Sequence, residues 1–241
     1  MQLDIAVSKI DKFGVSPSGD SVEITERPTG GLSVVLSDGQ GSGEAAKAIS
    51  SFVVSKAISL IADGARDGAV ARAVHDALYA RRRAQVSATL TIISADTNHG
   101  QLLVSRNSNC PVLVLPGGEG EEQAPEQVVL DADSSPIGTQ RMIKPHVEQF
   151  PLMIPRTVVA FSDGILSAGR GRGRRMKIGE LTGLAEGLSR QPVSEISRKI
   201  LGRAVERDQQ RPADDISVVV LKISRRTEDR QIREMWVRYP L

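Results

Sequence analysis

The sequence predicts an α+β domain built from layers of antiparallel strands and paired helices. Three observations predict it: six or more short apolar strands lie between turn residues, the helical periodicity falls in two groups of two helices, and no repeat or linker divides the chain. We therefore expect one domain over about residues 3–224, followed by a C-terminal tail over residues 225–241.

Strands are expected where apolar residues alternate with polar ones or run continuously between turn signals. Residues 3–10 alternate, which is typical of a half-buried strand, whereas residues 216–223 are apolar on both faces and are expected to be central in a sheet. The expected strands are 3–10, 21–26, 31–37, 87–95, 101–106, 111–115, 157–162 and 216–223. The fourth and fifth of these are expected to form a hairpin across Asn98-His99-Gly100.

Helices are expected where apolar residues recur at three- and four-residue spacing. The expected helices are 44–63, 68–83, 178–189 and 193–207. Residues 117–126 are acidic and turn-forming, and predict a surface loop. In the tail, Ile232, Met235, Trp236 and Tyr239 would form a helical stripe, which packs back onto the domain, is disordered or anchors a partner.

Composition places the chain among globular proteins. With 241 residues, 40% hydrophobic and 25% charged, it can bury a substantial core, and its net charge of +2 gives no argument for a nucleic-acid or membrane partner. The single cysteine, Cys110, excludes an internal disulfide and is expected to be a small buried residue. The N-terminus lacks the layout of a signal peptide, and no apolar run approaches the roughly 20 residues that span a bilayer. We expect a soluble, cytoplasmic protein without nucleic-acid or membrane partners.

Aspartates recur at the predicted strand ends. Asp38 and Asp163 each end a buried apolar strand and are followed at once by glycine, which lets the backbone turn sharply and approach a ligand. Asp214 stands just before the last strand, and Asp20 follows the turn-rich segment after the first strand. Each Asp-Gly pair taken singly is a common turn dipeptide. The four positions in this order are harder to explain as turns alone.

Carboxylates gathered at one rim of a sheet repel each other unless a cation lies between them. Mg²⁺ and Mn²⁺ bind through carboxylates, carbonyls and water. Two such ions can lower the pKa of a bridging water and shield phosphate oxygens. This chemistry cleaves phosphate esters without a nucleophile from the protein.

The order of these motifs resembles the metal-dependent protein phosphatase family (PPM), in its bacterial SpoIIE-type, RsbX-like branch. The matching motifs are Gly19-Asp20, the run from Asp38 to Gly43, Ser162-Asp163-Gly164 and Asp214-Asp215-Ile216-Ser217, with further similarity at 107–111 and 136–138. The resemblance spans about residues 3–224. It implies two stacked antiparallel β-sheets flanked by pairs of helices, and the activity of a serine/threonine protein phosphatase.

The resemblance also implies which residues act. Asp20 and Asp38 would bridge or share two Mn²⁺ or Mg²⁺ ions, with the Gly39 carbonyl completing one site, while Asp163 and Asp214 would hold the other ion. These four aspartates are the expected catalytic residues. Asp215 is a weaker candidate, because the first acid of that pair is the ligand in the family.

Two departures from the eukaryotic branch of the family affect the expected mechanism. Gln40 stands where that branch has a histidine proposed as general acid, and it cannot supply a titratable proton. A metal-bound water would then protonate the leaving group. The sequence also offers no obvious equivalent of that branch's N-terminal phosphate-gripping arginine, so the metals would hold the phosphate.

By resemblance, the substrate is a phosphorylated regulatory protein, and the chain is closer to free-standing RsbX-like members than to multidomain ones. The alternative is a non-catalytic module that keeps the phosphatase fold in order to bind a phosphoprotein. Retention of all four acidic positions weighs against that alternative, because a module without activity has no need of a full metal set.

Other conspicuous features fit less specific roles. The run from Gly39 to Gly43 is not a nucleotide loop, because Glu44 stands where the P-loop pattern requires lysine. His75 is expected to be structural, and none of the histidines has the paired spacing of a zinc site. Residues 170–177 carry basic charge and predict a solvated loop, a docking site for an acidic or phosphate-bearing partner or, less well without aromatic residues, a nucleic-acid contact.

Overall fold

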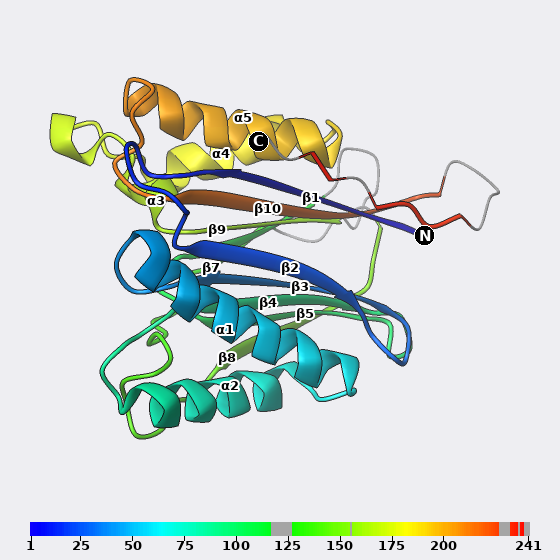
Figure 1. Cartoon of the computed structure of the whole chain (residues 1–241). Coiled ribbons are helices and arrows are strands. Elements are labelled where there is room, and N and C mark those ends of the chain that lie inside the picture. Colours follow the sequence, from blue (N-terminus) through cyan, green and yellow to red (C-terminus); the bar gives the residue numbers. More distant parts are fainter. Residues whose placement is uncertain (117–126, 155, 227–231, 236, 239–241) are drawn as a thin grey trace.

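Two five-stranded antiparallel sheets stack face to face, with helices on both outer faces (Figure 1). The computed structural model describes residues 1–116, 127–154, 156–226, 232–235 and 237–238. The first sheet has the order β1 (Gln2–Ile10), β10 (Ile216–Ser224), β9 (Arg156–Phe161), β6 (Val112–Pro116), β7 (Val128–Leu130). The second has the order β2 (Asp20–Glu26), β3 (Gly31–Asp38), β4 (Leu90–Asp96), β5 (Gln101–Asn107), β8 (His146–Pro151). This architecture confirms the predicted fold class.

Helices cover the two outer faces in separate groups. α1 (Gly43–Ala62) and α2 (Asp67–Arg82) cover the second sheet. The short α3 (Gly164–Ser167), a 3-10 turn at Arg170–Arg172, α4 (Ile178–Gly187) and α5 (Val193–Arg207) belong to the side of the first sheet (Figure 1). The result is a four-layer arrangement of helices, sheet, sheet and helices.

Strand β10 shows how one sequence supplies two hydrophobic layers. Successive side chains of a strand point to opposite faces, so Val218 and Val220 pack against α4 and α5, while Val219 and Leu221 pack between the two sheets. β10 is hydrogen-bonded to β1 on one side and β9 on the other. Its apolar character on both faces therefore correctly predicted a central strand.

Every strand expected from the sequence is present, and two further strands are not apparent from it. β7 is only three residues long, and β8 alternates half-buried and exposed residues at a sheet edge, so neither has a continuous apolar run. The expected strand at 87–95 begins only at Leu90, because Ala88 bridges Gly39 and Ile137 outside the sheet. The acidic loop expected at 117–126 lies outside the described residues.

Helix α1 corrects the expectation that no apolar segment is long enough to span a bilayer. It is 20 residues long with a mean hydropathy of 1.5, so by length and composition it could cross a membrane. In the fold, its face carrying Ile49, Val53 and Ile61 is buried against the second sheet and α2. The apolar residues that make α1 a possible membrane span by length and composition thus form one side of the hydrophobic core here.

The tail does not show the expected helix in its described part. Residues 232–235 have no helical structure, and Ile232 and Met235 are exposed. Arg233 pairs with Glu26 at 3.0 Å on the surface. Trp236 and Tyr239, the other members of the predicted stripe, lie outside the described residues.

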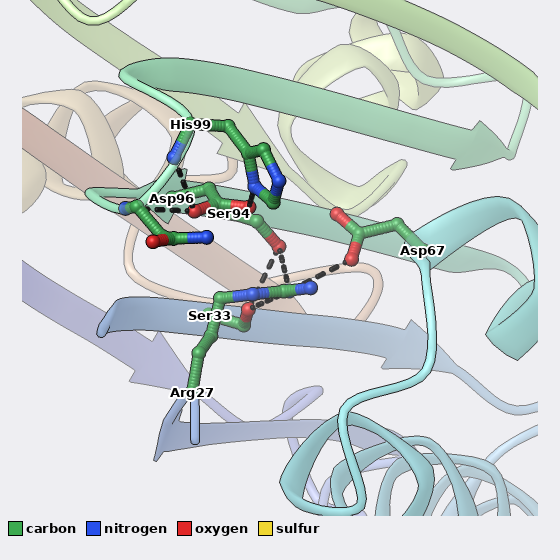
Figure 2. Close-up of polar contacts among 7 residues, drawn as sticks. Arg27, Ser33, Asp67, Ser94, Asp96 and His99 are labelled. Carbon is green, nitrogen blue, oxygen red and sulfur yellow. Dashed lines mark hydrogen bonds and ion pairs between the residues drawn. The ribbon is translucent and has the colours of Figure 1, made fainter. Parts of the chain in front are cut away.

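A buried ion pair fastens α2 to the sheet (Figure 2). Arg27 follows β2, and its Nη1 lies 2.9 Å from Oδ1 of Asp67, the first residue of α2, with side chains only 8% and 1% exposed. The same nitrogen donates to the hydroxyls of Ser33 and Ser94 on β3 and β4. Close by, His99 contacts the Asp96 carboxylate at 2.8 Å. This network lies about 23 Å along β2 from Asp20, at the other end of the strand.

We expect Asp67→Asn to lower the free energy of unfolding by about 3 kcal/mol, because it leaves a buried guanidinium without a counter-charge. Urea denaturation measures the change. The double variant Arg27→Met/Asp67→Leu is the control and should lose less than the single variant, since it removes both charges. A loss below about 1 kcal/mol for Asp67→Asn would contradict the importance of this pair.

Candidate active site

The predicted aspartates come together because each sheet brings one antiparallel strand pair to the same end of the sandwich. Asp20 begins β2 and Asp38 ends β3, and the two are directly opposite in the register. Asp163 follows the end of β9, and Asp214 precedes β10, its antiparallel neighbour. The start of α1 and the short α3 also lie at this end (Figure 1).

A pocket of about 250 Å³ opens at this end of the sheets. The carboxylates of Asp38, Asp163 and Asp214 line it, and its other lining residues are Gly39, Gln40, Gly41, Ser87, Ala88, Thr89 and Pro136. Asp20 is 1% exposed and lies next to Asp38, outside this lining set. Its Oδ2 is buried and has no hydrogen-bond partner among the described residues.

The glycines after Asp38 and Asp163 allow neighbouring elements to pack against the site. A Cβ at Gly39 would lie 2.1 Å from the carbonyl oxygen of Ala46 in α1. A Cβ at Gly164 would lie 2.1 Å from the carbonyl oxygen of Asp215, just before β10. Any side chain at these positions would push α1 or β10 away from the pocket, which gives the two Asp-Gly steps a packing role as well as a turning role.

Burial and mutual repulsion disfavour the ionised form of these carboxyls. Burial, followed by the charges of Asp20, Asp163 and other site aspartates, raises the pKa of Asp38 to about 8. Burial likewise raises the pKa of Asp20 to about 6, although the nearby hydroxyls of Ser217 and Ser162 and the charge of Lys9 oppose the rise. The negative charges of the other predicted ligands therefore act together to raise the pKa of Asp38.

The two pocket aspartates from the first sheet behave in the same way. The pKa of Asp163 is raised by burial and by the charge of Asp214, and the guanidinium of Arg175 opposes that rise. Burial also raises the pKa of Asp214, against the backbone N–H of Asp215 and the charge of Lys12. Cations from two different loops thus lie near the rim of the pocket.

Two lysines support Asp20 from the side of its main chain. Lys9 on β1 and Lys47 on α1 both donate to the carbonyl oxygen of Asp20, at 2.8 and 2.9 Å. Burial and the neighbouring charge of Lys47 lower the pKa of Lys9. Since a positive charge here favours ionised Asp20, the pair helps to keep a buried carboxylate available for a cation.

Asp215 has a different role from its neighbour Asp214. Its Oδ2 accepts the N–H of Gly19 at 2.8 Å, and its Oδ1 accepts the N–H of Lys12 at 2.9 Å. Both oxygens therefore hold the connection between β1 and β2, which leads directly into Asp20. Asp214 faces the pocket instead, as expected if the first acid of the pair is the one that meets a ligand.

Three pocket residues, Ser87, Ala88 and Thr89, carry no signal in the sequence, whereas Gln40 and Pro136 lie in motifs that resemble the family. Thr89 Oγ1 accepts the N–H of Asp38 at 2.9 Å, and Gln40 Oε1 accepts the N–H of Ser87 at 2.8 Å. Pro136 reaches the pocket because the following turn is fixed in two ways. Ile137 bridges Ala88, and His75 Nδ1 accepts the N–H of Gly138 at 3.1 Å. His75 is therefore structural, as expected, and Cys110 is buried, as expected.

The donor atoms of the site suit a hard divalent cation. They are all oxygens, and the orphaned Oδ2 of Asp20 is a buried anionic atom that needs a partner. Among the residues that the structure describes, however, no three or more His, Cys, Asp or Glu side chains stand close enough together to hold an ion as they are. The residues fit Mg²⁺ or Mn²⁺ by chemistry, and their assignment as ligands stays a prediction.

Solved phosphatase domains share this fold. The PP2C phosphatase domain of SpoIIE from Bacillus subtilis, with a fragment of its regulatory domain, matches with a TM-score of 0.76 at 19% identity, and 94% of this chain covers 64% of that one. RsbX in complex with magnesium matches with a TM-score of 0.70 at 16% identity, covering 92% of this chain and 96% of that one. The SiaA-PP2C domain of Pseudomonas aeruginosa matches with a TM-score of 0.75 at 18% identity, covering 91% and 86%. The fold is therefore of the PP2C type.

The sequence gives the family directly. The profile of the family described as Stage II sporulation protein E (SpoIIE) matches residues 28–224, most of the chain. The chain belongs to this family, within the PPM protein phosphatases, which confirms the resemblance carried by the motifs. No curated protein sequence matches the chain significantly.

We expect the metal-free protein to lose stability as the pH rises from about 4 to about 8. The folded state binds a proton on Asp38 more tightly than the unfolded state does, so the stability contributed by that proton is present below the unfolded pKa and is lost as the pH passes the folded pKa of about 8. Thermal melts across this range should show a shallower slope for Asp38→Asn, with a gain of about 1–2 kcal/mol at the alkaline end. Equal slopes for the two proteins would contradict this prediction.

Neighbouring alanine variants should separate the two acids before β10. Asp215→Ala removes two charge-assisted hydrogen bonds, so we expect a loss of about 3 kcal/mol in the free energy of unfolding. Asp214→Ala removes a carboxylate that faces the pocket among other negative charges, so the loss should be below about 1 kcal/mol while Mn²⁺ binding weakens. Urea denaturation and calorimetric titration with Mn²⁺ measure these effects, and the reverse ranking of stability would refute the division of roles.

Proposed function

We propose that this chain is a metal-dependent phosphatase that hydrolyses phosphoserine or phosphothreonine on a regulatory protein. The observation that carries the proposal is the convergence of Asp20, Asp38, Asp163 and Asp214 at one end of the stacked sheets. Membership of a protein phosphatase family supports it. A cytoplasmic location and the regulatory nature of the substrate remain predictions.

The proposed roles follow from where each oxygen lies. Bound divalent ions supply an activated water for attack on phosphorus and shield the phosphate charge. Asp38, Asp163 and Asp214 would hold them from the pocket wall, Asp20 from its position beside Asp38, and the Gly39 carbonyl from the turn after β3. Asp215, Lys9 and Lys47 would position Asp20 without contacting substrate.

Proton transfer to the leaving group needs a donor other than Gln40. The Oε1 of Gln40 already accepts from the N–H and hydroxyl of Ser87, and an amide does not titrate in the working range. The proposed hydrolysis therefore depends on the ions and the solvent that they order rather than on a histidine.

A non-catalytic module that binds phosphoproteins is the second candidate. It is favoured by one observation: the described side chains do not form a closed cluster that would hold an ion without adjustment. The raised pKa values of the site aspartates favour the enzyme instead, because neutral side chains would suit a binding module at a lower cost in stability.

Hydrolysis of p-nitrophenyl phosphate and of a phosphoserine peptide, each with Mn²⁺, Mg²⁺ or chelator, tests the proposal. We expect metal-dependent turnover that falls on the order of 100-fold or more in Asp38→Asn and in Asp163→Asn. Asp76→Asn, which removes an exposed acid from α2, is the matched control and should keep full activity.

Turnover that persists in chelator, or that is unchanged in Asp38→Asn, would refute the two-ion proposal. Binding of the phosphopeptide without turnover, at every metal tested, would establish the non-catalytic module in its place.

A further inference from the structure

Beside the pocket lies an exposed segment of high positive charge, residues 170–177, which we call the basic loop. It contains Arg170, Arg172, Arg174, Arg175 and Lys177, and all five side chains belong to exposed residues. The proposed hydrolysis uses none of them.

Hydrogen bonds and the burial of Met176 hold both ends of the basic loop in place. Gly169 donates its N–H to Asp208 Oδ1 at 2.8 Å, and Arg174 donates its N–H to the carbonyl oxygen of Gly169 at 3.0 Å. At the far end, Met176 is 2% exposed in the hydrophobic core and donates its N–H to the carbonyl oxygen of Ala168. The loop therefore presents its charges from a fixed position, and ordering it on binding costs little entropy.

Its position places those charges next to the candidate active site. The loop follows α3, which begins directly after Asp163, and lies at the same end of the sandwich as the start of α1 (Figure 1). Arg175 donates its Nε–H to the carbonyl oxygen of Leu166 at 2.8 Å, only three residues after Asp163. The loop thus lies close to Asp163, one of the aspartates that line the pocket, and the charge of Arg175 acts on that carboxyl.

The charged side chains of the loop have no carboxylate ion-pair partner among the described residues. The nearby Glu180 pairs with Arg203 and Arg207 instead. Arginine binds carboxylates and phosphates through a planar fork of donors, so clustered arginines without a carboxylate partner suit an acidic partner. Aromatic residues, which would stack on bases, are absent from residues 168–178.

We propose that the basic loop docks an acidic segment of the phosphoprotein substrate and so selects which phosphorylated proteins reach the pocket. This inference rests on the proposed phosphatase function and adds a substrate class to it: proteins with Asp or Glu residues flanking the phosphorylated serine or threonine. Charges on the rim of an interface act mainly on encounter and selectivity, so the loop leaves the chemical step itself unchanged.

The test compares two phosphoserine peptides that differ only in acidic or neutral flanks. The variant Arg170→Gln/Arg172→Gln/Arg174→Gln removes three loop charges and spares Arg175, which is hydrogen-bonded to Leu166. The matched control, Lys56→Gln/Arg72→Gln/Lys199→Gln, removes three exposed charges from helices α1, α2 and α5. Melting temperatures establish that both variants fold.

We expect the loop variant to lose about tenfold in kcat/KM on the acidic peptide, through KM, and less than about twofold on the neutral peptide and on p-nitrophenyl phosphate. The control should match the wild type on all three. Added salt should weaken turnover of the acidic peptide by the wild type and have little effect on the loop variant.

A binding measurement keeps this inference separate from the phosphatase proposal. Fluorescence anisotropy of the unphosphorylated acidic peptide, at low salt, should show binding to the wild type that the loop variant loses, whether or not any substrate is hydrolysed. Absence of metal-dependent hydrolysis of p-nitrophenyl phosphate would refute the phosphatase proposal. Binding of the acidic peptide would still test the docking role of the basic loop. Equal loss on both peptides, no loss on either, or tighter loop-dependent binding of a single-stranded oligonucleotide than of the acidic peptide would overturn the docking proposal.

Discussion

Mutual repulsion among carboxylates gathered at one end of the sandwich is the constraint to which the surrounding structure responds. Asp20, Asp38, Asp163 and Asp214 arrive from four strand ends, and their surroundings raise the pKa of each. A fold gains no stability from such an arrangement in the absence of a cation, since both burial and proximity oppose ionisation. A site that costs stability and concentrates one kind of charge is typical of function rather than of packing.

The neighbouring groups limit that cost. Lys9 and Lys47 bring positive charge to the main chain of Asp20, and Asp215 holds the connection that leads into Asp20. At the other end of β2, the buried pair of Arg27 and Asp67 holds α2 to the sheet. α1 packs with α2 on the second sheet, and α1 also packs against the turn at Gly39.

Family membership and the basic loop bear on different parts of the function. The SpoIIE family match accounts for the fold and for the order of the acidic motifs. The similar solved structures share the fold at low sequence identity, so they do not say what this chain recognises. Recognition has to come from surfaces around the pocket, and the basic loop is a charged surface that follows α3, the short helix after Asp163.

Much of this protein could be predicted from the sequence because its signals are local. Alternating apolar residues located the long strands, three- and four-residue spacing located the helices, and Asp-Gly steps after apolar strands located Asp38 and Asp163. β7 and β8 lack such a signal, since one is three residues long and the other is a half-exposed edge strand.

Contacts between segments distant in sequence could come only from the tertiary structure. The sequence does not reveal that Asp215 holds Gly19 and Lys12 rather than facing the pocket, or that Thr89 supports Asp38. It also does not reveal that α1, apolar enough to span a membrane, packs as one side of a core. The sequence by itself determined which residues stand at strand ends, because hydrophobic periodicity is a local property. Only the pairing of strands and the packing of the two sheets decided which of these groups meet, because the partners are at least 51 residues apart along the chain.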